Sequence, residues 1–341
     1  MKKCFSFEIA KVILFFNMAK KMYFCTLFPA MSKVRNIEYI NIINEKTLVT
    51  VGMFDGVHIG HQQLLRHFVE NAARSGMRPI AVTFDRHPRL VVDPGYRPQM
   101  LSTTSERLAM LEECGIEEVA VVHFDKETAS MSACKFATDY LLGHLNMGGL
   151  FLGYDNQFGR RNDNDFDKLP ALGRQMGFGI FWDDAVLIDG VEVSSTKIRH
   201  SLMRGDVERA ASMLGYPYTV EGTVVHGRHV GRGMGFPTAN VSISSRDKML
   251  PMPGVYMLRV EWQGSVYKAM ANLGPQPTFH LDKPVLEVHI LDFDGDLYGA
   301  TLRLSFLHRL RDIVAFATQE ALMKQLENDR KEVKRLSTFG L

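Results

Sequence analysis

Residues 51–61 read Val51-Gly52-Met53-Phe54-Asp55-Gly56-Val57-His58-Ile59-Gly60-His61. The β-branched run Thr47–Gly52 predicts a strand, and the apolar spacing after it, through Leu64 and Phe68, predicts a helix. Gly52 and Gly56 permit a tight turn and close backbone approach between the strand and the helix. The first turn of that helix offers unpaired N–H groups, so the stretch predicts an anion site where a strand passes into a helix.

Two histidines stand three residues apart in this stretch. On a helix, His58 and His61 therefore share one face and can both reach the same anion. Such side chains can donate hydrogen bonds to charge that develops on an α-phosphate and its bridging oxygen. Taken singly, each histidine is more often structural, and a zinc site would need further ligands that the sequence does not offer. Together with the two glycines, the histidines predict nucleotide binding.

Short β-branched runs continue to alternate with helical spacing beyond this motif. Strands are predicted at Pro79–Phe84, Val119–Phe124 and Leu150–Gly153, and a helix is predicted at Glu106–Cys114. Such alternation is typical of βαβ units, so we expect an α/β domain with a parallel sheet covered by helices. Ligands of such sheets lie beyond the carboxyl ends of the strands, which directs attention to the residues after Gly52, Phe84 and Gly153.

The pattern changes near Ser194. A capped helix is predicted from about Thr196 to Leu214, and Gly215-Tyr216-Pro217 ends it, which places a domain boundary there. Strand-like runs then occur at Thr219–Val225, Val255–Trp262, Val266–Asn272, Leu286–Phe293 and Thr301–Phe306. Regularly spaced short strands predict a closed antiparallel β-barrel, since closure removes exposed edges. A final helix is predicted from about Thr318 to Leu336.

The composition is that of an ordinary globular protein with two domains. The chain has 341 residues, 46% of them hydrophobic and 23% charged, and about 150 residues per domain gives two domains. We expect a first domain over residues 31–214 and a second over residues 218–341. Residues 1–30 are expected to be a dispensable extension or an over-called start, with Met31 as a candidate true start.

Charge, cysteines and apolar runs restrict partners and location. Lys and Arg number 40 against 38 Asp and Glu, so no overall charge favours nucleic acid. The four cysteines form no CxxC pair and no zinc-like spacing, which favours a cytoplasmic location. No apolar run approaches the roughly 18 to 20 residues that span a bilayer, so no membrane partner is expected. These features leave the oligomeric state open.

A second polar stretch opens the helix before the boundary. It reads Val193-Ser194-Ser195-Thr196-Lys197-Ile198-Arg199. Ser195 or Thr196 can cap that helix, which accounts for the hydroxyls but not for the two cations. Lys197 and Arg199 on the first turn would meet the phosphates that leave as pyrophosphate, with the arginine suited to bidentate contact.

These stretches resemble motifs of nucleotidyltransferases. Residues 58–61 are similar to the HxGH signature, which the HIGH motif of class I aminoacyl-tRNA synthetases also matches. Residues 193–199 resemble the ISSTxIR motif of the adenylylating module of bacterial FAD synthetases, and residues 83–88 and 153–159 resemble further stretches of that family. The resemblance implies catalytic roles for His58, His61 and Arg199 and a flavin-binding role for His87. It implies nucleotide binding by Gly52, Phe54, Asp55, Gly56, Asp155, Ser195, Thr196 and Lys197.

The second half contains a glycine-rich loop that ends in Pro237-Thr238-Ala239-Asn240. Spaced glycines let backbone N–H groups crowd around phosphate oxygens, although most such loops are simply turns. A fixed turn followed by a hydroxyl and an amide can complete a site for ATP and magnesium.

Glu287 lies in the strand-like run Leu286–Ile290, where alternation places it and His289 on one face. A carboxylate there could accept the proton of an attacking hydroxyl. On the strand pattern alone a solvated glutamate is the more usual interpretation, and only its company with the glycine-rich loop favours a catalytic role.

This half resembles flavokinases over nearly its whole length, including residues 253–256, 272–274, 277–279 and 286–289. The resemblance implies that Thr238 is a ligand of magnesium, that Asn240 supports the metal and the phosphates, and that Glu287 is the general base. It also implies nucleotide contacts from Gly231, Gly233, Gly235 and Pro237, and a flavin contact from Thr278.

Both resemblances together imply a bifunctional enzyme that makes FMN from riboflavin and then FAD from FMN. ATP and magnesium serve both steps, and small molecules are the expected partners, with no nucleic acid. One alternative is a class I synthetase-like, cytidylyl- or pantetheine-type transferase, which leaves the flavokinase motifs unexplained. The other is a non-catalytic flavin-binding or regulatory protein on a decayed scaffold, against which the intact charged and hydroxyl positions of both motif sets argue.

Overall fold

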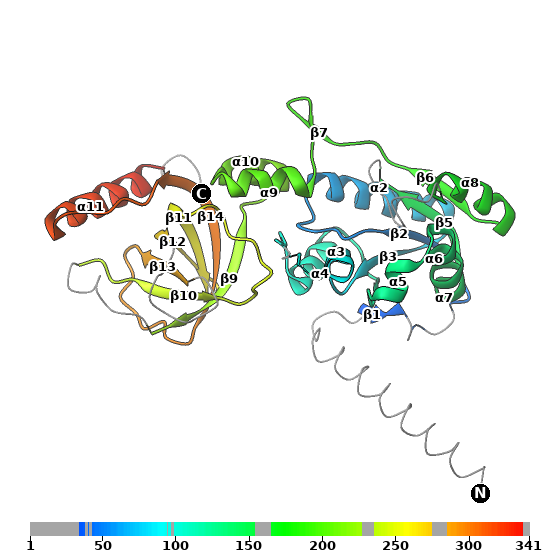
Figure 1. Cartoon of the computed structure of the whole chain (residues 1–341), viewed down its shortest axis with the longest axis horizontal. Coiled ribbons are helices and arrows are strands. Elements are labelled where there is room, and N and C mark those ends of the chain that lie inside the picture. Colours follow the sequence, from blue (N-terminus) through cyan, green and yellow to red (C-terminus); the bar gives the residue numbers. More distant parts are fainter. Residues whose placement is uncertain are drawn as a thin grey trace, which may run out of the picture. The chain divides into compact units, whose positions relative to one another are not determined.

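The computed structural model describes residues 34–37, 40, 43–93, 95–96, 99–153, 165–226, 235–274 and 285–336. The expected extension over residues 1–30 and the predicted site residues Asp155, Gly231, Gly233 and Thr278 lie outside these ranges. The chain forms two compact units, and Figure 1 labels most of their elements. The first holds the described residues before Gln99 together with Ser102–Glu192. The second holds Gln99–Leu101 and the described residues from Val193 onward.

The first unit is built on a parallel sheet with the strand order β1-β4-β3-β2-β5-β6. Its strands are β1 (Val34–Asn36), β2 (Thr47–Val51), β3 (Arg78–Phe84), β4 (Val119–Val122), β5 (Met147–Leu152) and β6 (Gly179–Trp182). The helices are α2 (Ile59–Ser75), α3 (Pro88–Val92), α4 (Thr104–Glu113), α5 (Lys126–Ser130), α6 (Ala133–Phe136), η2 (Ala137–Leu142), α7 (Gly143–Leu145) and α8 (Asp165–Met176). A small hairpin of β7 (Leu187–Ile188) and β8 (Val191–Glu192) follows. The predicted α/β fold with a parallel sheet is confirmed.

Helices cover both faces of this sheet, as Figure 1 shows. Apolar side chains of α2 and α4, such as Phe68 and Leu111, pack on one face. Side chains of α6, η2 and α7, such as Phe136 and Leu141, pack on the other. All five residues of β2 are buried, as expected of a parallel strand covered on both sides.

The second unit is a closed antiparallel barrel with the strand order β10-β13-β12-β11-β14-β9. Its strands are β9 (Thr219–Val225), β10 (Ala239–Ile243), β11 (Gly254–Trp262), β12 (Ser265–Leu273), β13 (Val285–Ile290) and β14 (Thr301–Arg311). The helix α11 (Gln319–Leu336) ends the described part, so the predicted barrel with a C-terminal helix is confirmed. Strand β10 is the one that sequence reasoning missed, because Pro237 and the residues after it read as a turn.

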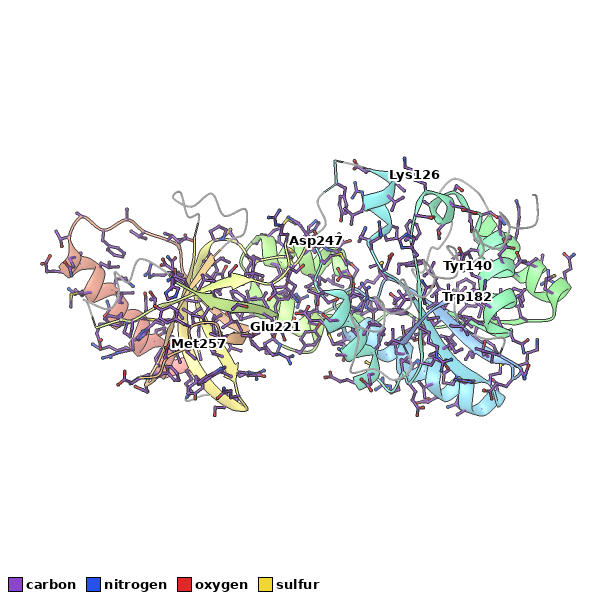
Figure 2. All side chains as sticks on the ribbon, turned by 90° about the horizontal axis from the view of Figure 1, so that it is seen from below. Lys126, Tyr140, Trp182, Glu221, Asp247 and Met257 are labelled. Carbon is purple, nitrogen blue, oxygen red and sulfur yellow. The ribbon has the colours of Figure 1, made fainter. Side chains whose placement is uncertain are left out.

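One face of the barrel wall packs against α11. Met257, labelled in Figure 2, lies opposite Met270, and both pack with Val333 of α11. The strands alternate, so the opposite face, which includes the fully buried Leu286 and Val288, fills the inside of the closed barrel. Among the described helices, none combines the length and apolar character that a bilayer crossing requires.

The helix predicted from Thr196 to Leu214 is in fact two helices, α9 (Ser195–Met203) and α10 (Val207–Leu214). The break is at Gly205, which has a φ of 75° and packs so tightly that a Cβ there would lie 2.5 Å from Arg309 Nε. Asp206 then caps α10 by accepting a hydrogen bond from Arg209 N. Both helices belong to the second compact unit, whereas the sequence placed them in the first domain; the boundary at residues 214–218 stays a prediction.

Candidate active sites

The loop between β2 and α2 is strained. Phe54 and Val57 have φ values of 47° and 32°, and Gly56 has a φ of 76°. Residues other than glycine rarely adopt this left-handed backbone conformation. Where the surrounding structure enforces such strain, it is often at a functional site. The loop lies at the carboxyl end of a central strand and leads into the helix N-terminus, the position predicted for the anion site.

A clamp between Asp55 and Ser102 holds this loop. Asp55 Oδ1 accepts hydrogen bonds from Ser102 N at 2.9 Å and from Ser102 Oγ at 3.1 Å. Ser102 Oγ accepts in turn from Gly56 N at 2.9 Å. Both side chains are buried. The carboxylate of Asp55, for which the sequence predicted nucleotide binding, therefore contacts Ser102 in the structure, and its contact with the nucleotide stays a prediction.

His58 and His61 lie together, as the spacing predicted. Their ring centroids are 3.7 Å apart with an interplanar angle of 15°, and Phe54 contacts His61 edge-on at 5.4 Å. His58 Nδ1 accepts a hydrogen bond from His61 N and so caps α2, which places the proton of a neutral His58 on Nε2. Burial, and secondly the charge of His58, hold the pKa of His61 well below its ordinary value.

His61 is therefore neutral near pH 7 and can offer one N–H to a ligand. Its Nδ1 is buried and has no hydrogen-bond partner among the described residues. A buried polar atom in that condition usually has a function or a ligand to account for it. The chemistry of the pair fits hydrogen bonding to a phosphate oxygen.

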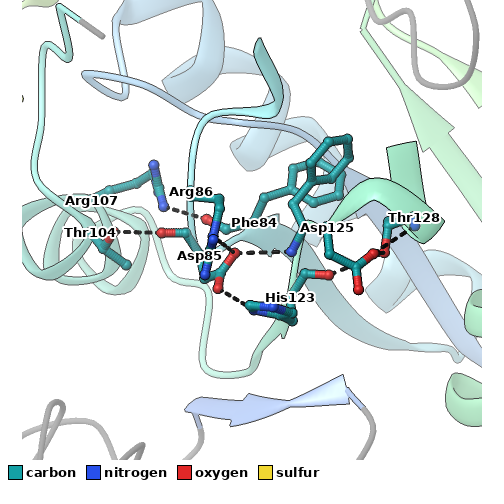
Figure 3. A network of polar contacts seen from close by, with 9 residues as sticks. Phe84, Asp85, Arg86, Thr104, Arg107, His123, Asp125 and Thr128 are labelled. Carbon is teal, nitrogen blue, oxygen red and sulfur yellow. Dashed lines mark hydrogen bonds and ion pairs between the residues drawn. The ribbon is translucent and has the colours of Figure 1, made fainter. Parts of the chain in front are cut away.

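The carboxyl ends of β3 and β4 carry a polar network, shown in Figure 3. His123 Nδ1 donates to Asp85 Oδ2 at 2.6 Å, and Phe124 N donates to Asp85 Oδ1 at 3.0 Å. Arg86 Nε lies 3.5 Å from the same oxygen. Asp85 therefore joins the ends of two neighbouring strands at the edge where sheet ligands lie.

Arg107 on α4 contacts the last residue of β3. It is 1% exposed, and its guanidinium donates to the carbonyl oxygen of Phe84 at 2.7 Å (Figure 3). Burial lowers the pKa of Arg107 to about 10, while the charges of Asp55 and Asp85 oppose the shift, so it remains cationic near pH 7. Sequence reasoning missed this buried cation because an arginine on an amphipathic helix reads as solvated.

His87 caps a helix. Its Nδ1 accepts from Arg89 N at 3.1 Å at the start of α3, and its ring lies 5.3 Å from that of Tyr96. These contacts give the His87 imidazole a structural role as a helix cap. Its contact with flavin stays a prediction.

Helix α9 carries the second polar stretch and belongs to the barrel unit. Its N-cap is Ser194, which accepts a hydrogen bond from Lys197 N, so the expectation that Ser195 or Thr196 is the cap is wrong. Arg199 Nε donates to the carbonyl oxygen of Gln99 at 2.7 Å. The proposed contacts of this helix with pyrophosphate stay predictions.

The segment Gln99–Leu101 is tied to the barrel unit along its length. Met100 N donates to the carbonyl oxygen of Asp247, which is labelled in Figure 2, at 2.7 Å. Lys248 Nζ donates to the carbonyl oxygen of Leu101 at 2.8 Å. Arg199 is therefore held by Gln99, whose next two residues are themselves bonded to Asp247 and Lys248.

An apolar cavity of about 460 Å³ lies between the barrel wall and α11. Its lining residues include Val255, Met270, Ile313, Val314, Phe316, Leu322 and Leu326. Its polar lining residues include Thr238, Asn240, Asn272 and Glu287. A mostly apolar cleft with a few convergent polar groups is the usual form of a small-molecule site.

A second cavity, of about 660 Å³, is more polar and adjoins the same strands. Pro237, Thr238, Asp294 and Asp296 are among its lining residues. Thr238 therefore lines both cavities. His289 Nδ1 donates to the carbonyl oxygen of Pro237 at 2.8 Å and so fixes the turn before Thr238. Burial lowers the pKa of His289.

An ion pair between the buried Asp329 and the partly buried Arg311 lines the apolar cavity. Arg311 Nε lies 3.0 and 3.1 Å from the two carboxylate oxygens of Asp329, and its terminal nitrogen lies 2.7 Å from Oδ2. Gln325 adds a hydrogen bond to Asp329 Oδ1 at 2.8 Å. The pair joins the end of β14 to α11, and sequence reasoning assigned it no role.

Curated relatives described as bifunctional riboflavin kinase/FMN adenylyltransferase match along nearly their whole lengths. The Haemophilus influenzae protein is 32% identical, over 89% of this chain and 98% of its own. The Escherichia coli K12 protein is 35% identical, over 87% of this chain and 94% of its own. The chain belongs to this family. The FAD synthetase family matches residues 40–197, and the riboflavin kinase family matches residues 214–337.

A solved structure agrees in fold over both units. The crystal structure of a Streptococcus pneumoniae protein, described as a macrolide-efflux protein, has a TM-score of 0.80 and 30% identity. The match covers 89% of this chain and 98% of that one. The prediction of a bifunctional riboflavin kinase and FAD synthetase is confirmed, and the synthetase-like and non-catalytic alternatives are set aside.

Three contacts of the enzyme were not foreseen from its sequence. Ser102, Asn272 and Arg107 each contact a residue far away in the chain. For Ser102 the only sequence signal is its place just before a helix start, which also suits an ordinary cap. For Asn272 the signal is its position on a strand, which gives no partner without the register.

Proposed function

We propose that the apolar cavity holds the flavin ring and ribityl chain of riboflavin, and that ATP occupies the polar cavity beside it. The observation that carries this proposal is that Thr238 lines both cavities, with Glu287 in the wall of the apolar one. A planar aromatic ring gains free energy from burial against aliphatic side chains, whereas nucleotide phosphates require polar surroundings. The γ-phosphate and the terminal ribityl hydroxyl would then meet near Thr238.

In the kinase step Glu287 accepts the proton of the ribityl 5′-hydroxyl. The hydroxyl oxygen then forms a bond to the γ-phosphorus of ATP, and the bond from that phosphorus to the β,γ-bridging oxygen breaks to release ADP. The products are FMN and ADP. The chemistry resembles phosphoryl transfer in other kinases, where positioning and charge stabilisation provide most of the rate.

The donors near Thr238 fit magnesium that arrives with ATP. Magnesium prefers oxygen ligands and keeps waters and substrate phosphates in its shell. The Thr238 hydroxyl and the Asn240 amide oxygen are ligands of that kind. No cluster of three or more His, Cys, Asp or Glu side chains suited to a metal occurs in the described part of the chain. The ion would supply charge neutralisation of the phosphates.

In the second step an oxygen of the FMN phosphate attacks the α-phosphorus of another ATP, and pyrophosphate leaves. FMN brings an anionic nucleophile, so this site needs hydrogen-bond donors rather than a base. His58 and His61 would donate to oxygens of the α-phosphate, and Lys197 and Arg199 would neutralise the pyrophosphate. The stacked histidines and the strained loop that presents them support this assignment.

The two substitutions that test the kinase assignment are Glu287→Gln and Thr238→Ala. Glu287→Gln nearly preserves shape but cannot accept a proton, so we expect riboflavin phosphorylation to fall roughly 10²- to 10⁴-fold. Thr238→Ala should raise the magnesium concentration needed for half-maximal rate, which Glu287→Gln should not do. FAD formation from supplied FMN should persist in both variants. Near-normal FMN production by folded Glu287→Gln protein would remove Glu287 as the base.

The near-balanced charge supports small molecules as the partners, with no nucleic acid, and the cysteine pattern supports a cytoplasmic location. Fractionation of cells that express the tagged chain would test the location. Gel-shift titration with duplex and single-stranded nucleic acid would test the partner assignment.

A further inference from the structure

Asn272 lies in a row of three polar side chains on the barrel. Strand β13 runs between β10 and β12, and Glu287 is paired with Asn240 on one side and with Asn272 on the other. Residues directly opposite each other in neighbouring strands point to the same face. All three residues line the apolar cavity, so the predicted base stands between two amides.

Only the nitrogen of the Asn272 side-chain amide has a hydrogen-bond partner among the described residues. Its Nδ2 donates to Glu287 Oε2 at 3.4 Å. Its Oδ1 is buried and has no hydrogen-bond partner among the described residues. Gly274 adds no side chain beside this amide; a Cβ there would lie 3.7 Å from Oδ1. A buried acceptor without a donor is costly, so a ligand hydroxyl that reached this oxygen would relieve that cost.

We propose that Asn272 bridges Glu287 and the ribityl hydroxyl next to the reacting one. The inference rests on the proposed role of Glu287. Adjacent ribityl carbons carry hydroxyls, so when the 5′-hydroxyl donates to Glu287, the 4′-hydroxyl is its immediate neighbour. That 4′-hydroxyl donates to Asn272 Oδ1, while Nδ2 continues to hold the carboxylate. Asn272 thereby restrains the base and the substrate in one geometry, which favours the attacking arrangement.

The test is a double-mutant cycle between the full-length enzyme and its substrate. FMN-forming rates are measured with riboflavin and with 4′-deoxyriboflavin, for the unaltered protein and for Asn272→Ala. The 4′-deoxy substrate alone should lower kcat/KM roughly 10- to 100-fold, the effect of one lost hydrogen bond to a buried group, and Asn272→Ala should lower it at least as much, because it also removes the donor to Glu287. Both together should cost little more than Asn272→Ala alone, because the contact with the hydroxyl is then already lost. If the fold-losses from Asn272→Ala and from the 4′-deoxy substrate multiply, the two changes act independently and the proposed bridge is wrong.

Asn272→Asp separates the two halves of the bridge. It keeps an acceptor for the hydroxyl but replaces the donor to Glu287 with a second carboxylate. We expect a lower kcat with the preference for riboflavin over the 4′-deoxy compound retained. Equal rates with both substrates would contradict the hydroxyl contact, and an unchanged kcat would contradict the hold on Glu287. Should Asn272→Ala melt below the assay temperature, Asn272→Ser replaces it in the cycle.

Two controls complete the design. Val266→Ala, on the same strand but 61% exposed, should behave as the unaltered protein with both substrates. Glu287→Gln, assayed in parallel, distinguishes failure of the bridge from failure of the proposed base. If the Glu287→Gln enzyme is active, Glu287 is not the base, and the proposed bridge is excluded with it. If the Glu287→Gln enzyme is inactive but the losses at Asn272 multiply, only the bridge is excluded.

Discussion

Asp55 accepts two hydrogen bonds from Ser102, one from its backbone N–H and one from its hydroxyl, which in turn accepts from Gly56 N. One serine thus satisfies a buried carboxylate and a buried backbone donor 46 residues away in the chain. The loop that it holds contains residues in the left-handed region, which do not keep that conformation without support.

Ser102→Ala is expected to impair FAD formation from FMN more than riboflavin phosphorylation. The change removes the Ser102 Oγ contacts of Gly56 N and of Asp55 Oδ1, at a cost of about 1–3 kcal/mol in loop stability. We expect a roughly tenfold or greater fall in adenylylation, with partial recovery in Ser102→Thr, measured by chromatography of FMN and FAD. Ser105→Ala, an exposed neighbour, is the matched control. Equal rates for Ser102→Ala and Ser105→Ala would show that the clamp does not position the loop.

His61→Ala is expected to lower adenylylation of FMN on the order of 10²- to 10³-fold, the usual effect of losing one preorganised donor. Riboflavin phosphorylation should stay nearly intact, because that reaction is assigned to the barrel unit. Arg66→Ala, an exposed position on the same helix, is the control for helix effects. A parallel loss of both activities would point to misfolding, and unchanged FAD synthesis would remove His61 from the mechanism.

Asp329→Asn is expected to destabilise the barrel unit and to raise the KM for riboflavin. Removing one partner of a fully buried ion pair typically costs about 3–5 kcal/mol, and because the remaining Arg311 is 20% exposed, we expect a smaller loss here. The pair Glu332–Arg335 on the same helix has similar geometry but is exposed, so Glu332→Gln should change little. Thermal melting and the KM for riboflavin are the measurements. Similar melting curves for Asp329→Asn and Glu332→Gln would refute the assigned role of the buried pair.

A fragment from Tyr218 to Leu341 is expected to fold and to phosphorylate riboflavin, without making FAD. The structure adds that a longer fragment, from Val193, should melt at a higher temperature. The reason is that α10 packs on β14 and has buried residues such as Val207 and Leu214, and the shorter fragment lacks this helix. Equal melting temperatures would contradict this, and an inactive Val193 fragment would mean that the kinase requires the first unit.

The sequence by itself determined the features that depend on local spacing. His58 and His61 stack because a separation of three residues places them on one face where α2 begins. Glu287 and His289 share a cavity wall because strand side chains alternate with a period of two. Alternation of strands and helices in the first half, and regularly spaced strands in the second, were enough to predict a parallel sheet and a closed barrel.

Tertiary structure alone decided the contacts between residues far apart in the chain. Ser102 meets Asp55, Asn272 meets Glu287, and Arg311 meets Asp329 only after the sheet, the barrel register and the docking of α11 are set. The break at Gly205 belongs to the same class, since it depends on close packing against Arg309. Local propensity carries no information about such partners. A residue's neighbours across strands and helices follow from the register and packing of the whole unit.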